Sequence, residues 1–154
     1  MMREIKFEVV KGLEDREVTM PYRSTTGSAG YDFVALEDVT FPSIWDTETK
    51  PTLVKTGVKA KFPNDVVLKL YSRSSLGVKK GLMLPNSVGV IDSDYYSNPG
   101  NDGEIMFPFI NITNTPQKIR KGQRIGQGIF SYILLTSDDN AVGDRKGGIG
   151  STGE

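Results

Sequence analysis

The chain contains neither cysteine nor histidine among its 154 residues. Disulfide frameworks, zinc sites built on thiolates or imidazoles, thiol nucleophiles and Ser-His-Asp triads are therefore excluded. Any catalysis has to use carboxylates, hydroxyls, amides, basic groups or a metal that arrives with the substrate. The chain also lacks an excess of charge of one sign, because 19 Lys and Arg balance 19 Asp and Glu. We therefore expect no nucleic-acid binding.

Long hydrophobic runs are missing as well. No run approaches the ~20 apolar residues that a membrane span needs. Residues 1–10 alternate charged and apolar side chains, where a secretory signal would carry a continuous apolar segment. We therefore expect no membrane association and a cytoplasmic location. A chain of this length suits one domain.

What the sequence does contain is an apolar period of two. Apolar and polar residues alternate over 5–9, 58–62 and 66–71, which is typical of half-buried strands. Longer apolar runs over 105–112 and 125–135 favour strands covered on both faces. Turn-forming residues separate these runs. The pattern predicts an all-β fold of the sandwich, barrel or jelly-roll kind.

A single short helix is predicted within this β fold. It would begin near Ser74 or Ser75, both good N-cap residues, and end at about Lys80 before Gly81. The two serine hydroxyls and Arg73 would then stand beside free backbone amides, where an anion could bind. Ordinary helix capping explains the serines equally well.

Glycine is abundant, with 17 residues, and the C-terminus is rich in it. We expect residues 1–136 to form the folded domain and 137–154 to form a linker and a flexible C-terminal arm, too polar to fold alone. Residues 148–153 match the dinucleotide pattern G-x-G-x-x-G, but no helix can follow, because only Glu154 remains. Glycine, serine and threonine amides beside basic side chains could still clamp a phosphate. A frayed terminus is the simpler alternative.

Two carboxylates occupy positions that chemistry could use. Asp92 follows an apolar Val-Ile pair and precedes Tyr95, so it could act as a base on water, or it could simply end a polar hairpin. Asp32 lies within an apolar strand, where a carboxylate is costly unless it is paired or serves an ion. Residues 122–127 alone indicate only a turn that opens a strand, with Gln127 on one face.

Taken together and in order, five segments resemble the five motifs of the trimeric dUTP diphosphatases (dUTPases). The resemblance implies a jelly-roll-like β subunit in a threefold homotrimer, whose C-terminal arms close over sites built mainly by neighbouring subunits. It also implies that the substrate is dUTP and that water attacks the α-phosphorus, giving dUMP and pyrophosphate and keeping uracil out of DNA. The five segments are 29–32, 73–77, 89–95, 122–127 and 147–153.

The resemblance also implies a role for individual residues. Asp92 would orient and deprotonate the attacking water, and Tyr95 would pack under the deoxyribose and exclude a 2′-hydroxyl. Asp32 would hold water bound to a Mg²⁺ ion that rides mainly on the triphosphate. Asn86 and the backbone around Gly89 and Ile91 would bind uracil. Ser74, Ser75 and Gln127 would bind phosphate oxygens, and Arg73 would lie on the phosphate side or between subunits. The arm would contribute Arg145, Lys146, Ile149, Gly150, Ser151 and Thr152.

Three features depart from the family pattern. Ile149 stands where the family has an aromatic residue over the uracil, and Asp144 stands where it has an arginine, with Arg145 one position nearer. Residues 96–103 exceed the family's short turn, so we expect an extended tip on the uracil hairpin. That tip motivates one alternative, a phage-type member that also binds a regulatory protein. A relative resembling dCTP deaminase is the other, although residues 74–83 contain no acidic side chain for it.

Overall fold

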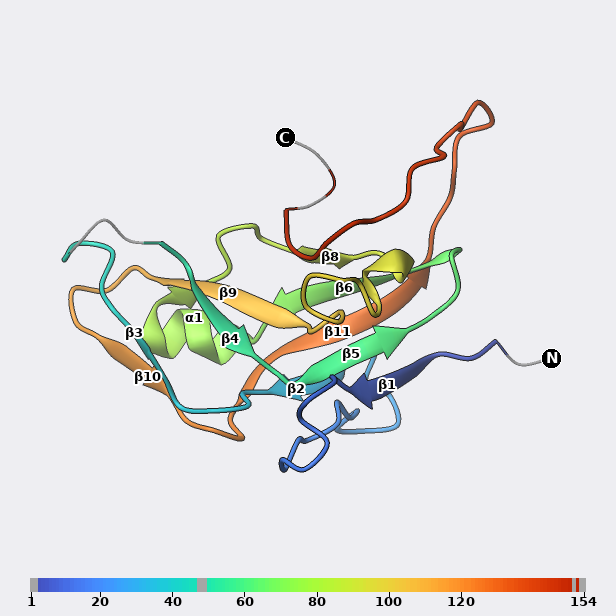
Figure 1. Cartoon of the computed structure of the whole chain (residues 1–154). Coiled ribbons are helices and arrows are strands. Elements are labelled where there is room, and N and C mark those ends of the chain that lie inside the picture. The colour runs from blue at the N-terminus through green and yellow to red at the C-terminus, as the bar shows by residue number, and fades with distance from the viewer. Residues whose placement is uncertain (1–2, 47–49, 151, 153–154) are drawn as a thin grey trace.

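The computed structural model describes residues 3–46, 50–150 and 152 (Figure 1). These residues form a β-rich body with one α-helix and one turn of 3₁₀-helix, η1. In chain order the elements are β1 (Lys6–Val9), β2 (Tyr31–Val34), β3 (Val39–Phe41), β4 (Thr52–Lys55), β5 (Val58–Lys61), β6 (Val66–Ser72), α1 (Ser74–Lys80), β7 (Leu82–Met83), β8 (Gly89–Ile91), η1 (Ser93–Tyr95), β9 (Met106–Asn111), β10 (Gln117–Ile119) and β11 (Arg124–Tyr132).

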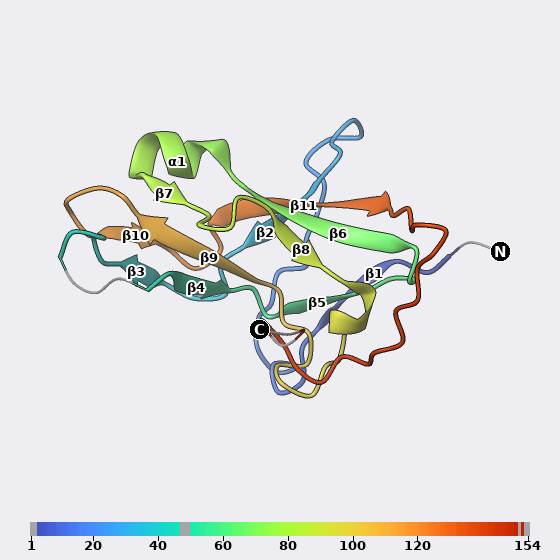
Figure 2. The ribbon, with the colours of Figure 1, turned by 90° about the horizontal axis from the view of Figure 1, so that it is seen from above.

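The strands pair antiparallel in four hydrogen-bonded sheets. The largest has the order β2-β11-β6-β8, and a second has the order β4-β9-β7. The pairs β1-β5 and β10-β3 complete the body. Figure 2 shows these sheets stacked around a common interior, with α1 at one end. The expected jelly-roll-like β fold with one short helix is therefore present, although the described strands do not close into a single barrel.

Aromatic side chains fill the core between the sheets. The Phe33 and Phe107 rings lie 5.5 Å apart and the Phe41 and Phe109 rings 6.0 Å apart, measured between centroids. All four are essentially buried, and burying one such side chain stabilises the fold by about 1.5–3 kcal/mol. Buried and half-buried residues alternate along β9, so this run is covered fully on one face only, not on both as its composition suggested.

The strand predicted over 125–135 ends earlier, at Tyr132. Its partner β6 begins at Val66, which lies opposite Tyr132, and one further backbone hydrogen bond, from the Ile133 amide to the Asp65 carbonyl at 3.0 Å, ends the pairing. Beyond it Leu134 and Leu135 are 97% and 70% exposed in the single chain. The expectation that this whole run is covered on both faces is therefore wrong for its last residues.

The helix begins one residue earlier than its serines suggested. Arg73, not Ser74 or Ser75, is the N-cap, because its extended backbone donates to Ile125 of β11 and the chain turns helical directly after it. The C-terminus follows the prediction, since Gly81 adopts the left-handed conformation (φ 61°) that commonly ends a helix.

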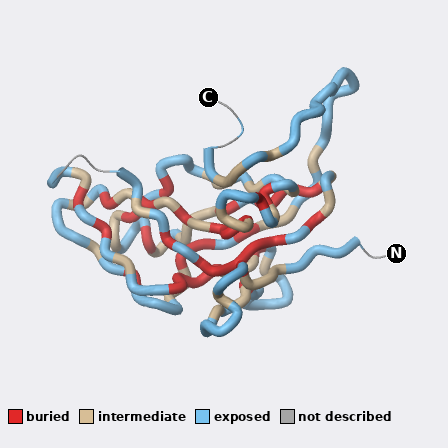
Figure 3. The backbone as a smooth tube through the Cα atoms, in the orientation of Figure 1, coloured by how far each residue is buried: buried red, intermediate tan, exposed pale blue. Residues whose placement is uncertain are grey.

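After β11 the described residues form no further helix or strand. Residues 134–144 are exposed and loop out from the body beyond the end of β11, and the chain then returns over β8 (Figures 1 and 3). In the described part of the chain, α1 is far too short to cross a membrane.

Candidate active site

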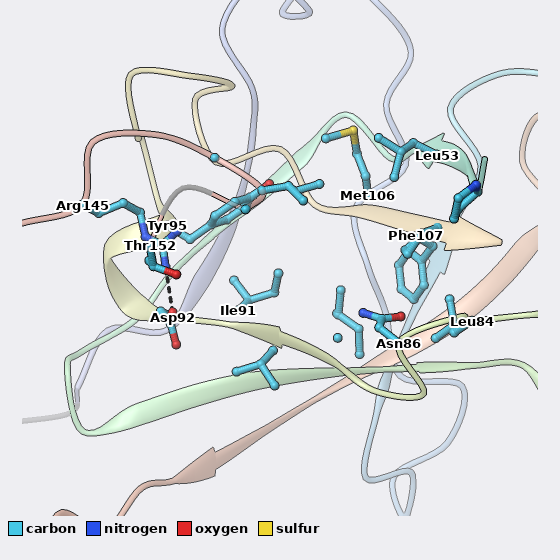
Figure 4. Close-up of a pocket in the computed structure, with 18 residues that line it drawn as sticks. Leu53, Leu84, Asn86, Ile91, Asp92, Tyr95, Met106, Phe107, Arg145 and Thr152 are labelled. Atoms are coloured by element: carbon cyan, nitrogen blue, oxygen red, sulfur yellow. Dashed lines mark hydrogen bonds and ion pairs between the residues drawn. The ribbon is translucent and has the colours of Figure 1, made fainter. Parts of the chain in front are cut away.

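A cavity of about 490 Å³ lies between β8, β9 and the start of β4, and the C-terminal arm roofs it (Figure 4). Apolar side chains such as Leu70, Leu84 and Phe107 line its inner part. Nine of the residues predicted to bind or act on substrate line it too: Asn86, Gly89, Ile91, Asp92, Tyr95, Arg145, Ile149, Gly150 and Thr152.

The short strand β8 sets the positions of the polar residues around the cavity. Gly89 pairs with Leu70 of β6, and a Cβ on Gly89 would lie 3.0 Å from the Leu70 Cβ, so glycine allows this close approach. Asp92 follows β8 with extended backbone and starts η1, whose Tyr95 amide donates to the Asp92 carbonyl. This single turn places the Asp92 carboxylate at the mouth and the Tyr95 ring in the wall.

Two hydrogen bonds hold the hydroxyl of Tyr95 in place. The Oη atom donates to the Glu104 carbonyl at 2.6 Å and accepts from Asn101 Nδ2 at 2.7 Å. Burial raises the pKa of Tyr95 above its ordinary value, and the Asn101 hydrogen bond only partly opposes this. The phenol therefore stays protonated at neutral pH and acts as a fixed wall of the cavity, not as a base.

Arg145 of the arm spans the mouth of the cavity. Its Nη2 atom lies 2.7 Å from Asp92 Oδ2 and its Nε atom 2.7 Å from Asp94 Oδ1. The guanidinium also lies 5.7 Å from the centre of the Tyr95 ring, within the range of a cation–π contact. Charge-assisted hydrogen bonds of this kind are the strong ones, so the arm is tethered to the turn that carries Asp92.

Asp94 was not among the predicted site residues. One feature of the sequence pointed to Asp94. It lies two positions after Asp92, and in a tight turn two carboxylates at this spacing can bind one cationic side chain. In the structure both carboxylates are more than half exposed, whereas the Arg145 side chain is only 9% exposed. The two acids therefore form one anionic patch.

The residues predicted to contact the phosphates lie elsewhere. Leu70 of β6 lines the cavity and pairs with Gly89, whereas β6 ends two residues later at Ser72, directly before Arg73 and α1. Within the described chain, none of the predicted phosphate set lines the cavity. That set is Arg73, Ser74, Ser75 and Gln127; Lys146 is exposed and also outside the cavity lining, and Ser151 lies outside the described residues.

Asp32 lies in this second region, on β2 opposite Gln127 of β11. Its Oδ2 atom accepts from Ser24 Oγ at 2.6 Å and lies 3.5 Å from an Arg124 nitrogen. Gly30 lies close by, and a Cβ there would meet Gln127 Oε1 at 2.4 Å and Gln127 Cβ at 3.1 Å, so the Gln127 side chain would have to shift. The described residues contain no group of three or more acidic side chains that could cage a metal ion.

Residues 96–103 do not form an extended hairpin tip. They follow η1 as a compact loop, with Asn98 buried and the Ser97 amide donating to the Asp102 carbonyl. Asp102 explains this shape, since it pairs with Lys59 of β5 at 2.8 Å and so draws the loop onto the body.

The fold and the cavity together define a jelly-roll-like β-protein with a partly apolar ligand site and carboxylates at its mouth. A family model described as dUTPase matches residues 16–153. The deoxyuridine 5′-triphosphate nucleotidohydrolase of Lactococcus lactis subsp. lactis is 45% identical over 149 residues, which cover 96% of each chain. That of Wolbachia pipientis wMel is 33% identical, with 97% of each chain covered.

A solved structure gives the same answer. The dUTPase of Streptococcus mutans superimposes with a TM-score of 0.75 at 40% identity, covering 85% of this chain and 98% of that one. The chain belongs to the dUTPase family.

Proposed function

We propose that this chain hydrolyses dUTP to dUMP and pyrophosphate, with water attacking the α-phosphorus. The observation that carries the proposal is the cavity itself, which gathers Asp92, Tyr95 and Asn86 with the returning arm. Relatives that match almost the whole chain are named as nucleotidohydrolases of deoxyuridine triphosphate.

The inner cavity suits a uracil deoxynucleoside. Asn86 and the backbone of Gly89 and Ile91 line it and would read the edge of the base, while Leu70 and Phe107 cover the faces of the ring. The Tyr95 ring, held by two hydrogen bonds to its hydroxyl, would lie under the sugar and leave no room for a 2′-hydroxyl. A rigid wall excludes an added group more strictly than a mobile one, because the wall cannot move aside.

Asp92 is the group that would take the proton from the attacking water. It stands at the mouth and is more than half exposed, so water reaches it. In the structure Arg145 neutralises it, and the substrate's phosphates would offer Arg145 a stronger anionic partner. Transfer of Arg145 from Asp92 to the phosphates would free the base at the moment the substrate is bound, which is the positioning and electrostatic task that phosphoryl transfer requires.

Mg²⁺ fits this chain as an ion that arrives with the triphosphate. Asp32 offers a single carboxylate that is already bonded to Ser24, which suits contact through water better than direct coordination in a protein cage. Mg²⁺ would neutralise phosphate charge when bound. A dUTPase of phage phi11, 18% identical with a TM-score of 0.69, is described with a structural Mg(II) ion, which supports the ion's relevance to this fold.

A homotrimer would complete the site. None of the predicted phosphate residues Arg73, Ser74, Ser75 and Gln127 lines the cavity of this chain, so a second subunit would bring such residues to a substrate bound here. Exposed apolar side chains favour subunit contact, since large apolar patches mark interfaces; they include Val90, Tyr132, Leu134 and Leu135. The structure contains one chain, whose arm lies over its own cavity, so the exchange of arms stays a prediction. Sedimentation equilibrium should give three times 16.9 kDa.

The deciding experiment is pyrophosphate release from dUTP and Mg²⁺ by Asp92→Asn. Loss of a general base lowers turnover by about 10²–10⁴-fold, so a reduction in that range is expected. Asp138→Asn, on the exposed segment after β11, is the matched control and should turn over normally. Unchanged turnover in Asp92→Asn would remove Asp92 from the mechanism.

The two alternatives receive less support. A deaminase would need an acidic group near α1, and α1 has only basic residues, Lys79 and Lys80, in its last turn and no acid in its first; release of ammonia from dCTP would revive it. Binding of a regulatory protein stays a prediction, although its motive, an extended tip, is replaced by a compact loop. The cytoplasmic location likewise stays a prediction.

A further inference from the structure

We infer that residues 97–103, here called the seat loop, are the docking site of the C-terminal arm. The inference deepens the proposed function, because it names what holds the arm closed over the substrate. The arm's Gly147 and Gly148 would pack against the backbone of Gly100 and the side chain of Asn101, and this contact would fix the next residue, Ile149, over the cavity.

The seat loop is cross-linked within itself. The buried Asn98 side chain donates from Nδ2 to the Tyr95 carbonyl and to Asn101 Oδ1, each at 2.7 Å. Its Oδ1 atom accepts from the amides of Gly100 at 2.9 Å and Asn101 at 3.1 Å. Two backbone hydrogen bonds join Asp102 to residues 97 and 98. The loop therefore presents a fixed surface, not a mobile tip.

A buried cation anchors the loop to the body. Lys59 Nζ lies 2.8 Å from Asp102 Oδ2 and 3.2 Å from Ser97 Oγ. The Lys11 amide donates to the same Asp102 oxygen at 2.9 Å. Burial alone would raise the pKa of Asp102, but Lys59, the amide and the charge of Lys11 together hold that pKa below its ordinary value. Asp102 is therefore ionised at neutral pH and keeps the loop in place.

The contact with the arm is too close for side chains. A Cβ on Gly100 would lie 2.9 Å from the Gly148 amide nitrogen and 3.5 Å from Gly147 Cα. A Cβ on Gly148 would lie 2.8 Å from Asn101 Nδ2. By contrast, a Cβ on Gly143 of the same arm would meet nothing within 4 Å. The close approach is thus specific to the point where the arm crosses the seat loop, and both glycines allow it.

The seat loop also touches the site. Asn101 donates to the Tyr95 hydroxyl and meets the arm with the same amide group. Ile149 and Gly150, which follow the docked glycines, line the cavity. The family's aromatic residue over the uracil is absent here. Packing of the arm's glycines against Gly100 and Asn101 would hold the arm over the cavity, as ring stacking would in relatives with the aromatic residue. The longer loop after Tyr95 provides the surface for this packing.

The test is Gly148→Ala and Gly100→Ala, compared with Gly143→Ala. Neither Gly100 nor Gly148 has a positive φ, so alanine introduces a clash at the contact without backbone strain. Displacement of a closing element by about 1 Å can cost up to about 10²-fold in rate, so kcat/KM should fall at least about tenfold in either variant. Gly143→Ala should be unaffected. The double variant should be no slower than the single ones.

A second measurement follows the arm directly. Trypsin cleaves after Arg145 and Lys146, and the seated arm should protect both, more so with a nonhydrolysable dUTP analogue. Gly148→Ala and Gly100→Ala should be cut several-fold faster than the wild type, while the thermal midpoint of the body stays unchanged. The control Gly143→Ala should be cut at the wild-type rate.

Truncation after Gly143 separates the inference from the proposed function. Without an arm, Gly100→Ala should have no further effect on turnover. If it slows the truncated and the full-length protein equally, or if cleavage is unchanged in both glycine variants, the seat loop is not the docking site. If the wild type releases no pyrophosphate, the proposed function fails, and protease protection still decides whether the loop seats the arm.

Discussion

Asp102→Asn tests the buried ion pair that anchors the seat loop to the body. The Lys59 side chain on β5 is only 7% exposed. It pairs with the Asp102 carboxylate, whose side chain is 18% exposed. Removing one partner of a buried pair costs about 3–5 kcal/mol, whereas exposed pairs contribute about 0–1 kcal/mol. Asparagine still accepts one hydrogen bond from Lys59, and Asp102 is not wholly buried, so we expect a loss of about 2 kcal/mol in the free energy of unfolding.

The effect depends on pH in a defined direction. The pKa of Asp102 lies below its ordinary value of 3.8. A carboxyl with a lowered folded-state pKa stabilises the fold above its unfolded-state pKa, and this stabilisation is lost as pH falls through the folded-state pKa. The difference between wild type and Asp102→Asn should therefore be full at pH 7 and should shrink below about pH 4.

Urea unfolding measures this loss, at one protein concentration for all variants because oligomer stability depends on it. Glu4→Gln is the matched control, since it breaks only exposed pairs, those with Lys6 and Lys61, and should leave the midpoint nearly unchanged. A second variant, Asp102→Asn with Lys59→Met, should recover part of the loss, because it removes the unpaired buried charge. A loss at pH 7 below about 0.5 kcal/mol, the range of an ordinary surface substitution, would refute the claim that this pair anchors the seat loop.

Two further changes test the arm and the wall of the cavity. Truncation after Gly143 should lower turnover far more than it lowers the thermal midpoint, because none of the described residues that it removes belongs to the buried core; normal turnover would show that the arm is only a frayed terminus. Tyr95→Phe should cost about 1–2 kcal/mol in unfolding free energy, because the Glu104 carbonyl loses its donor and Asn101 loses its acceptor. The remaining ring should still discriminate dUTP from UTP in a pyrophosphate assay, and UTP turnover would contradict the role given to the ring.

The parts of the site that could be predicted are those that lie close together in the sequence. Asp92 and Tyr95 are three residues apart, and one 3₁₀ turn brings both to the cavity. A short strand paired with β6 then fixes the backbone of Gly89 and Ile91. Local pattern was enough for these residues because few degrees of freedom separate them.

The parts that could not be predicted depend on pairings distant in sequence. Alternation over 58–62 places Lys59 on the polar face of a strand, yet it is buried, because a loop more than 40 residues later covers it with Asp102. The contact between Arg145 and Asp94 spans 51 residues. No local propensity encodes either pair; only the packed fold brings the charges together.

The predictions of the helix start and of the last strand's end failed for a related reason. Ser74 and Ser75 are intrinsically better caps than Arg73, but the Arg73 amide is committed to β11, and that tertiary hydrogen bond decides where the helix begins. Apolar composition predicted that the last strand continues to residue 135, although β11 ends at Tyr132 and the last backbone hydrogen bond joins Ile133 to Asp65. Propensity is a weak prior that tertiary hydrogen bonds override.

The departures from the family pattern are better understood together than singly. An aliphatic residue at position 149 covers the cavity without stacking, so closure of the arm needs another source of free energy. The longer loop after Tyr95 offers one, since its extra residues are drawn inward by Lys59 and face the arm with a glycine. If the two changes compensate each other, shortening the loop should harm closure more in this chain than in a relative that keeps the aromatic residue. An aromatic side chain placed at Ile149 should make the chain less sensitive to Gly100→Ala.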